Sequence, residues 1–332
     1  MAGAMAAHMD AGAVATHHER VFEFLLSALG LRERAPWPMA QTAAVESACV
    51  SAFLSLVMKL SERQFRPLFS RLLEWSGRSG VGAVPEGRRA AFYRLVAALA
   101  QRLRSMFAPY FRHVLPDAVE ILSRHKPPTE KKVKKRRKAG AEEPPLAERQ
   151  TAYLLVLEVV RCIHRCCQYD NVGLMDQDRF EAVFPGVVCQ LRGPEPEREV
   201  LEGLGEGLEP ELEGGLAAAR EEGAETLGVA VVGCLAQMAV VGGSDAMWKP
   251  LNRKVLVTAR KGGRRTRLLA LAVLHELVDR LKDEYLPLVP ETLQYLSELL
   301  EDSDQMVANK TRKAIKAMEE LSSEKLDRYL KP

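Results

Sequence analysis

The sequence predicts an all-α protein built from stacked helical hairpins. Its 332 residues are 47% hydrophobic, which is enough to bury a substantial core. Apolar residues recur at steps of three and four along most of the chain, and the alternation typical of β-strands is almost absent. A third observation is a motif that returns along the chain. Because one helical hairpin cannot bury its own apolar stripe, a repeated hairpin indicates a stacked array.

The clearest hairpin lies near the C-terminus. A helix is expected over residues 264–281, with one apolar stripe formed by Leu268, Leu271, Leu274, Val278 and Leu281. A second amphipathic pattern starts near Val289 and stops at the acidic turn 301–304. Pro287 and Pro290 are expected to mark the start of this second helix, since proline is tolerated in a first turn. The motif between the two helices reads Tyr-Leu-Pro-Leu-Val-Pro-Glu over residues 285–291.

The motif is an aromatic residue followed within five positions by proline, with apolar residues around it. Its copies begin at Phe65, Phe111, Phe180, Trp248 and Tyr285, so the intervals are 46, 69, 68 and 37 residues. HEAT and armadillo units span roughly 40 to 47 residues, and removing an insertion of about 23 residues from each long interval restores that length. The sequence therefore predicts a HEAT/armadillo-type α-solenoid of about five to six helical hairpins with two disordered charged insertions.

These intervals divide the chain into segments. We expect a disordered lead-in over 1–17, HEAT-type repeats over 18–125, a basic proline-flanked disordered insertion over 126–149, a repeat over 150–192, an acidic Gly/Glu-rich insertion over 193–215, and repeats with a cap over 216–332. The helix before Phe111 is expected to point Phe92, Leu95, Leu99, Leu103 and Met106 inward. The final helix, near residues 305–321, has a polar outer face that suits the end of a solenoid.

Two basic clusters are candidates for function, because a net charge of only +3 leaves nucleic-acid binding to local groups. The first is an import signal or RNA contact made of Lys131, Lys132, Lys134, Lys135, Arg136, Arg137 and Lys138. The second has no acid between Asp245 and Glu276, and comprises Lys249, Arg253, Lys254, Arg260, Lys261, Arg264, Arg265 and Arg267. Three ligands are compatible with this second cluster: RNA, an acidic surface of a partner protein, or the acidic insertion of this chain.

The sequence offers no candidate catalytic site. It lacks a phosphate-binding loop, a nucleophile elbow and a His-Glu-x-x-His motif, and no carboxylate pair stands out. Cys162, His164, Cys166 and Cys167 do not share one helix face, so we interpret the cysteines as core residues rather than metal ligands. We expect no enzyme activity, no cofactor and no small-molecule substrate.

The six cysteines lack the close, even spacing of a secreted disulfide framework, which favours a reducing compartment. The N-terminus lacks the pattern of a secretory signal. The longest uncharged run, Thr226 to Ser244, contains several glycines and falls short of a comfortable membrane span, so a buried helix is the preferred interpretation and no membrane partner is expected.

Particular stretches resemble a known family. Leu60 to Phe69, followed by Glu74-Trp75, is similar to a stretch near the C-terminus of the large HEAT-repeat proteins of the small-subunit processome. Residues 283–292, 298–302 and 326–330 resemble the chain end of the same family. This is the family of HEAT repeat-containing protein 1, named U3 small nucleolar RNA-associated protein 10 in fungi, and the chain resembles its C-terminal region.

The resemblance implies a non-catalytic structural subunit of the nucleolar small-subunit processome. It implies partners among the other processome proteins, pre-ribosomal RNA and the U3 small nucleolar ribonucleoprotein, and a location in the nucleus and nucleolus. It also implies support for ribosomal RNA processing and for transcription by RNA polymerase I. The alternative is a HEAT-repeat adaptor of another class, such as a nuclear transport or phosphatase scaffold, which would bind no ribosomal precursor.

Overall fold

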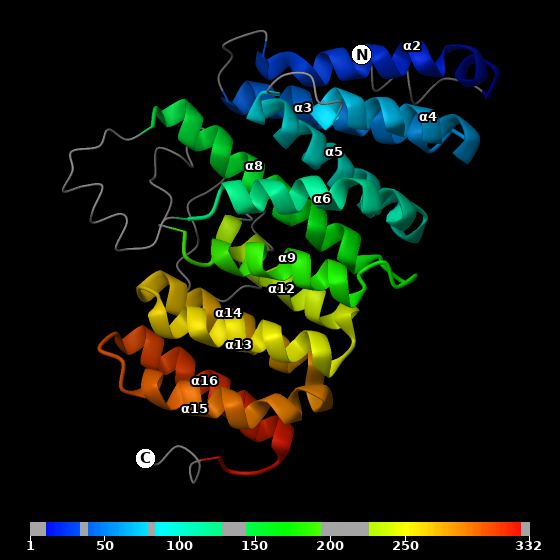
Figure 1. Ribbon diagram of the computed structural model, residues 1–332. Coiled ribbons are helices and arrows are strands. Elements are labelled where there is room, and N and C mark those ends of the chain that lie inside the picture. The colour runs from blue at the N-terminus through cyan, green and yellow to red at the C-terminus, as the bar shows by residue number, and fades with distance from the viewer. Residues whose placement is uncertain (1–10, 34–38, 79–83, 128–143, 194–225, 327–332) are drawn as a thin grey trace. The chain divides into compact units, whose positions relative to one another are not determined.

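The computed structural model describes residues 11–33, 39–78, 84–127, 144–193 and 226–326 (Figure 1). The regular elements in these ranges are all helices, and no strand occurs in them. The predicted all-α, HEAT-like fold is confirmed. The described residues separate into two compact units. One boundary between them follows Leu115, inside a helix, and another follows Tyr169.

The first unit contains the helices before residue 116 together with a later helix. Its elements are α2 (Ala11–Leu29), η1 (Gly30–Glu33), α3 (Met39–Val57), α4 (Glu62–Leu73), η2 (Glu74–Arg78), α5 (Glu86–Leu103), η3 (Arg104–Phe107), the first half of α6 (Ala108–Arg124), and α8 (Leu146–Gln168). Helices α5 and α8 share the most extensive contact in this unit. Phe65 and Phe69 of α4 pack against Phe107 and Tyr110 with ring centroids 4.9–5.6 Å apart.

The second unit is a two-layer helical array. Its elements are the second half of α6, then α9 (Gln177–Gln190), α12 (Leu227–Gly242), α13 (Asp245–Lys261), α14 (Arg264–Leu281), η4 (Lys282–Leu288), α15 (Val289–Leu300) and α16 (Gln305–Ser322). Helices α12, α14 and α16 pack side by side as one layer, and α9, α13 and α15 form the other (Figure 1). In the central helix α14 an unbroken run of residues from Leu268 to Leu274 is buried.

The repeated motif marks the second helix of a hairpin, and its aromatic residue belongs to the core each time. Phe65, Phe111, Phe180, Trp248 and Tyr285 lie on α4, α6, α9, α13 and η4, and all five are buried. In the clearest hairpin the expected bounds 264–281 are those of α14. Pro290 lies in the first turn of α15, where proline is tolerated. Pro287 lies just before that helix, inside the 3-10 turn η4.

Three expectations from the sequence are wrong in detail. Helix α2 begins at Ala11, so residues 11–17 are not part of a disordered lead-in. Helix α8 begins at Leu146, so the last residues of the segment 126–149 are helical. Met106 is 67% exposed instead of pointing inward. The cause is Arg104, whose φ of +53° ends α5 and breaks the helical spacing that would have carried Met106 to the core.

The predicted insertions fall largely outside the described residues, and the helices next to them are clear. α6 ends at Arg124 before the first insertion, while α9 ends at Gln190 and α12 starts at Leu227 on either side of the second. No described helix is both long and apolar enough to cross a membrane. The uncharged run that was the one candidate from the sequence forms α12, whose residues are mostly buried within the array.

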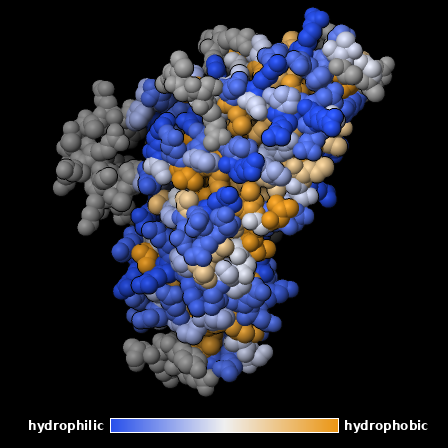
Figure 2. Space-filling view, turned by 45° about the vertical axis from the view of Figure 1, so that its right-hand side comes forward, coloured by the Kyte–Doolittle hydropathy of each residue, from blue (hydrophilic) through white to orange (hydrophobic). Residues whose placement is uncertain are grey.

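The face of the molecule in Figure 2 is mostly hydrophilic, with apolar patches between polar regions. The large apolar side chains that are exposed lie far apart along the chain, at Phe24, Met58, Met106, Leu146, Val172, Val240 and Leu286. Single exposed apolar residues are normal for a folded protein, so this list alone identifies no binding surface.

Candidate nucleic-acid interface

The first predicted basic cluster, Lys131 to Lys138, lies outside the described residues. Its interpretation as an import signal or RNA contact therefore stays a prediction.

The second predicted cluster is distributed over α13 and the start of α14. We call Lys249, Arg253, Lys254, Arg260, Lys261, Arg264, Arg265 and Arg267 the α13–α14 basic cluster. The sequence shows no acid between these positions, but the fold brings acids from the next repeat to them. Most members of the cluster therefore have partners within unit two.

Two arginines of α13 face two glutamates of α15. Arg253 Nε lies 4.0 Å from Glu291 Oε1, and Arg260 Nε lies 2.9 Å from Glu298 Oε2. Both pairs join residues 38 positions apart, and the pairs are seven residues apart on each helix, which is two helical turns. The Arg260 guanidinium also lies 5.8 Å from the centroid of the Tyr295 ring, a cation–π distance. These contacts align neighbouring repeats.

The start of α14 is paired with the acidic turn that precedes α16. Arg264 Nε lies 2.6 Å from Asp304 Oδ2, and one Arg267 terminal nitrogen lies 3.0 Å from Asp302 Oδ2. Asp304 also caps α16 by accepting hydrogen bonds from the backbone N–H groups of Met306 and Val307. The hydrogen bond from Arg264 and then those N–H groups hold the pKa of Asp304 below its ordinary value.

The other cluster members differ in their surroundings. Lys249 pairs with Asp245 one turn earlier on α13, at 2.7 Å. Arg265 donates a hydrogen bond to the carbonyl oxygen of Gly193, at 3.3 Å. Lys254 and Lys261 are exposed and have no ion-pair partner among the residues that the structure describes. Four of the eight side chains pair with carboxylates of other elements, and Lys249 pairs within α13. Half of the α13–α14 basic cluster is therefore used in contacts between neighbouring repeats.

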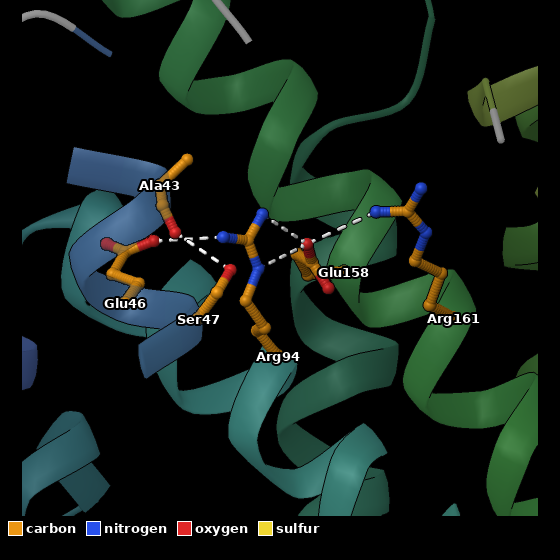
Figure 3. Close-up of polar contacts among 6 residues, drawn as sticks. All are labelled: Ala43, Glu46, Ser47, Arg94, Glu158 and Arg161. Atoms are coloured by element: carbon orange, nitrogen blue, oxygen red, sulfur yellow. Dashed lines mark hydrogen bonds and ion pairs between the residues drawn. The ribbon is translucent and has the colours of Figure 1, made fainter. Parts of the chain in front are cut away.

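A buried charged cluster in unit one escaped the sequence analysis (Figure 3). Arg94 of α5 donates from Nε to Glu158 Oε1 of α8, at 2.9 Å, and from a terminal nitrogen to Glu46 Oε2 of α3, at 3.1 Å. Arg161 lies 3.3 Å from Glu158 on its other side. Burial alone would lower the pKa of Arg94, but the charges of Glu158 and Glu46 outweigh it and raise that pKa. Arg94 therefore stays charged and joins three helices.

A neutral polar cluster lies beneath the C-terminal hairpin motif in unit two. The Tyr285 hydroxyl donates to Asn252 Oδ1 of α13 at 3.0 Å and lies 3.0 Å from Thr292 Oγ1 of α15. Asn252 Nδ2 donates to Thr292 Oγ1, which donates in turn to the Leu288 carbonyl. All three side chains are fully buried. Burial raises the pKa of Tyr285 far above its ordinary value, so its hydroxyl stays protonated as a donor.

The cysteines of α8 belong to the core. Cys162, Cys166 and Cys167 are buried in it, and no disulfide joins any of the six cysteines. No group of three or more His, Cys, Asp or Glu side chains that could hold a metal ion occurs within the described part of the chain.

The chain matches known proteins over nearly its whole length. The family model of the BP28CT (NUC211) domain matches residues 13–175. An uncharacterized protein of Arabidopsis thaliana is 32% identical over 97% of this chain. HEAT repeat-containing protein 1 of Danio rerio is 28% identical over 97% of it, and U3 small nucleolar RNA-associated protein 10 of Neurospora crassa is 27% identical over 83%.

The resemblance to the HEAT repeat-containing protein 1 family is confirmed. Members of this family are much longer than the present chain, which spans only 13–14% of the length of those three relatives. The match therefore concerns a small part of each relative. The name HEAT repeat-containing protein 1 agrees with the two-layer helical array found in unit two.

Proposed function

We propose that this chain is a non-catalytic structural subunit in ribosome biogenesis, acting in the nucleolar small-subunit processome. The observation that carries the proposal is the match of 83–97% of the chain to relatives named HEAT repeat-containing protein 1 and U3 small nucleolar RNA-associated protein 10. A stacked helical array supports it, because such arrays act mainly by presenting extended surfaces to other macromolecules. The polar clusters of the described residues likewise join helices to one another.

The proposal includes a location and partners. The chain would reside in the nucleus and nucleolus, contact other small-subunit processome proteins, and meet pre-ribosomal RNA and the U3 small nucleolar ribonucleoprotein directly or through those proteins. The proposal also includes support for ribosomal RNA transcription by RNA polymerase I. Lys131 to Lys138 would serve as an import signal or as an RNA contact, since seven of these eight residues are cationic.

Localisation and sedimentation test the proposal together. A tagged full chain should concentrate in nucleoli and sediment with particles that contain precursor ribosomal RNA. A chain that stays diffuse in the cytoplasm, and sediments apart from those particles, would contradict it. A chain that enters the nucleus but binds transport or phosphatase subunits instead of precursor particles would identify the other adaptor class.

A further inference from the structure

The outward side of the last helix carries a second positive surface. We call Lys310, Arg312, Lys313 and Lys316 the α16 basic face. Arg312, Lys313 and Lys316 are exposed, and Lys310 is half-buried beside them. The opposite side of α16 is packed into unit two through Val307, Thr311, Ala314, Ile315 and Met318. Spacings of three and four residues place the basic side chains together on the side that the array leaves open.

Arg312, Lys313 and Lys316 have no carboxylate partner from a neighbouring repeat among the described residues. Arg312 donates to the Asn309 amide oxygen at 2.8 Å, a neutral partner. Lys316 lies 3.6 Å from Glu320 on the same helix, and both side chains are highly exposed, so water screens the pair. Lys313 has no ion pair with any described residue. The α13–α14 basic cluster, by contrast, is paired with acids one repeat further on.

The electrostatics of Lys310 agree with a positive surface. Burial, and then the charge of Lys313 one turn away, lower the pKa of Lys310. Like charges on neighbouring turns repel each other, and an anion bound between them would relieve that repulsion.

The first turn of α16 contacts the start of α14. A terminal nitrogen of Arg264 lies 3.5 Å from the Met306 sulfur in the first turn of α16. Met306, Lys310 and Lys313 follow at steps of four and three, so they share one side of the helix. Lys261 lies three residues before Arg264 and is exposed. Arg264 is itself paired with Asp304, so the α16 basic face is limited to Lys310, Arg312, Lys313 and Lys316.

The composition of the face indicates what kind of partner it fits. No large apolar side chain is exposed on α16, and Gln305 and Asn309 add exposed amides to the same side. Stable protein interfaces usually have an apolar centre, whereas contacts with nucleic acid are polar and strongly positive. We propose that the α16 basic face binds the phosphate backbone of RNA without sequence preference. This rests on the proposed function, which places the chain in an RNA-containing assembly.

The test is the affinity of the purified full chain for a single-stranded oligouridine RNA, measured over a range of salt concentrations. The triple variant Arg312→Gln, Lys313→Gln, Lys316→Gln should bind about 10- to 100-fold more weakly at 0.1 M salt. The slope of log affinity against log salt concentration should become shallower by about 2, because each of three phosphate contacts to a single strand contributes about 0.7. Both chains should also carry Gln at the seven basic positions of 131–138, so that this segment does not hide the difference.

Matched variants separate charge from folding. The variant Arg312→Lys, Lys313→Arg, Lys316→Arg keeps the charges and should bind as the parent does. Replacing Lys249, Arg253 and Lys254 on α13 with Gln removes the same number of cations elsewhere and should change the affinity less. Unchanged affinity and salt slope in the α16 Gln variant would overturn the inference. Polyglutamate stands for an acidic protein partner, so a variant that loses polyglutamate binding but keeps RNA binding would overturn it too. If that variant binds RNA normally while the chain still sediments with precursor particles, the α16 inference fails and the proposed function stands.

Discussion

Arg94 Nε donates to Glu158 Oε1 at 2.9 Å, joining α5 to α8 through two side chains that are 64 residues apart in the sequence. Glu158 is 3% exposed and Glu46, the other partner of Arg94, is 1% exposed. A buried ion pair contributes little beyond an apolar pair of the same shape, but its charges are costly when one partner is removed. The main effect of Arg94 is therefore to fix the packing of three helices.

Replacing Arg94 with Met should destabilise unit one strongly. The two buried carboxylates would lose their shared cation, and we expect the free energy of unfolding to fall by about 3 kcal/mol. Urea denaturation followed by circular dichroism measures this. Arg102→Met on the exposed side of the same helix is the control and should change stability by less than about 0.5 kcal/mol. Equal effects of the two substitutions would show that the buried cluster has no special role.

Removing the Tyr285 hydroxyl should cost less than removing Arg94, but it should still be measurable. Tyr285→Phe leaves Asn252 Oδ1 without its buried donor, so we expect a loss of about 1–3 kcal/mol. Tyr295→Phe, at a partly exposed position on the next helix, is the matched control. A thermal melt that is the same for Tyr285→Phe and for the parent would contradict the importance of this hydrogen bond.

The same tyrosine predicts a change at alkaline pH. The folded-state pKa of Tyr285 is raised by burial above the value of about 10 for an exposed tyrosine. The stability linked to this group is thus fully present below pH 10 and is lost as the pH rises above it, because the unfolded chain releases the proton first. The stability difference between the parent and Tyr285→Phe should shrink between pH 9 and pH 11.5. A constant difference over that range would argue against a buried, protonated hydroxyl.

Two residues at equivalent positions hold a conformation that favours glycine. Arg104 follows α5 and Lys282 follows α14, with φ of +53° and +50° and ψ of −128° in both. Such strain costs about 1–3 kcal/mol, and glycine relieves it at an entropic cost of about 0.5–1 kcal/mol. Lys282→Gly should therefore stabilise the chain by about 1 kcal/mol, seen as a higher melting temperature. Lys282→Ala keeps the strain and should not, so equal melting temperatures of the two variants would refute this explanation.

The inter-repeat pairs should differ in strength according to their exposure. Arg267 and Asp302 are 26% and 5% exposed, whereas Arg253 and Glu291 are 73% and 36% exposed and 4.0 Å apart. We expect Arg267→Gln to lower stability by about 1–2 kcal/mol and Arg253→Gln by less than about 0.5 kcal/mol. Double-mutant cycles with Asp302→Asn and Glu291→Gln measure the two couplings. A larger coupling energy for the Arg253–Glu291 pair than for the Arg267–Asp302 pair would contradict the expected dependence on exposure.

Local sequence patterns identified much of the fold. The apolar stripe placed α14 from Arg264 to Leu281, and the aromatic motif marked a buried residue in each of five helical elements. The prediction for Met106 was wrong because the sequence does not show that Arg104 has a positive φ. Glycine is the residue that usually indicates such a conformation, and arginine does not. Helix spacing extended past such a residue gives the wrong face.

The site was less predictable because its contacts are long-range. The eight cations of the α13–α14 basic cluster look unpaired in the sequence. Four of them, Arg253, Arg260, Arg264 and Arg267, have their acids 35 to 40 residues further on, at Glu291, Glu298, Asp304 and Asp302. The repeat length could have suggested this offset, since the motif copies at Trp248 and Tyr285 are 37 residues apart. Arg94 and its two carboxylates gave no local signal, because three separate helices contribute them.

We propose above that this chain acts in small-subunit ribosome assembly. Affinity purification of the tagged full chain, with sequencing of the bound RNA, tests it most directly when the parent is compared with a variant carrying Ala at the seven basic positions of 131–138. We expect precursor ribosomal RNA and U3 small nucleolar RNA to be enriched with the parent and reduced with the variant. Enrichment of neither RNA with the parent chain would contradict the claim.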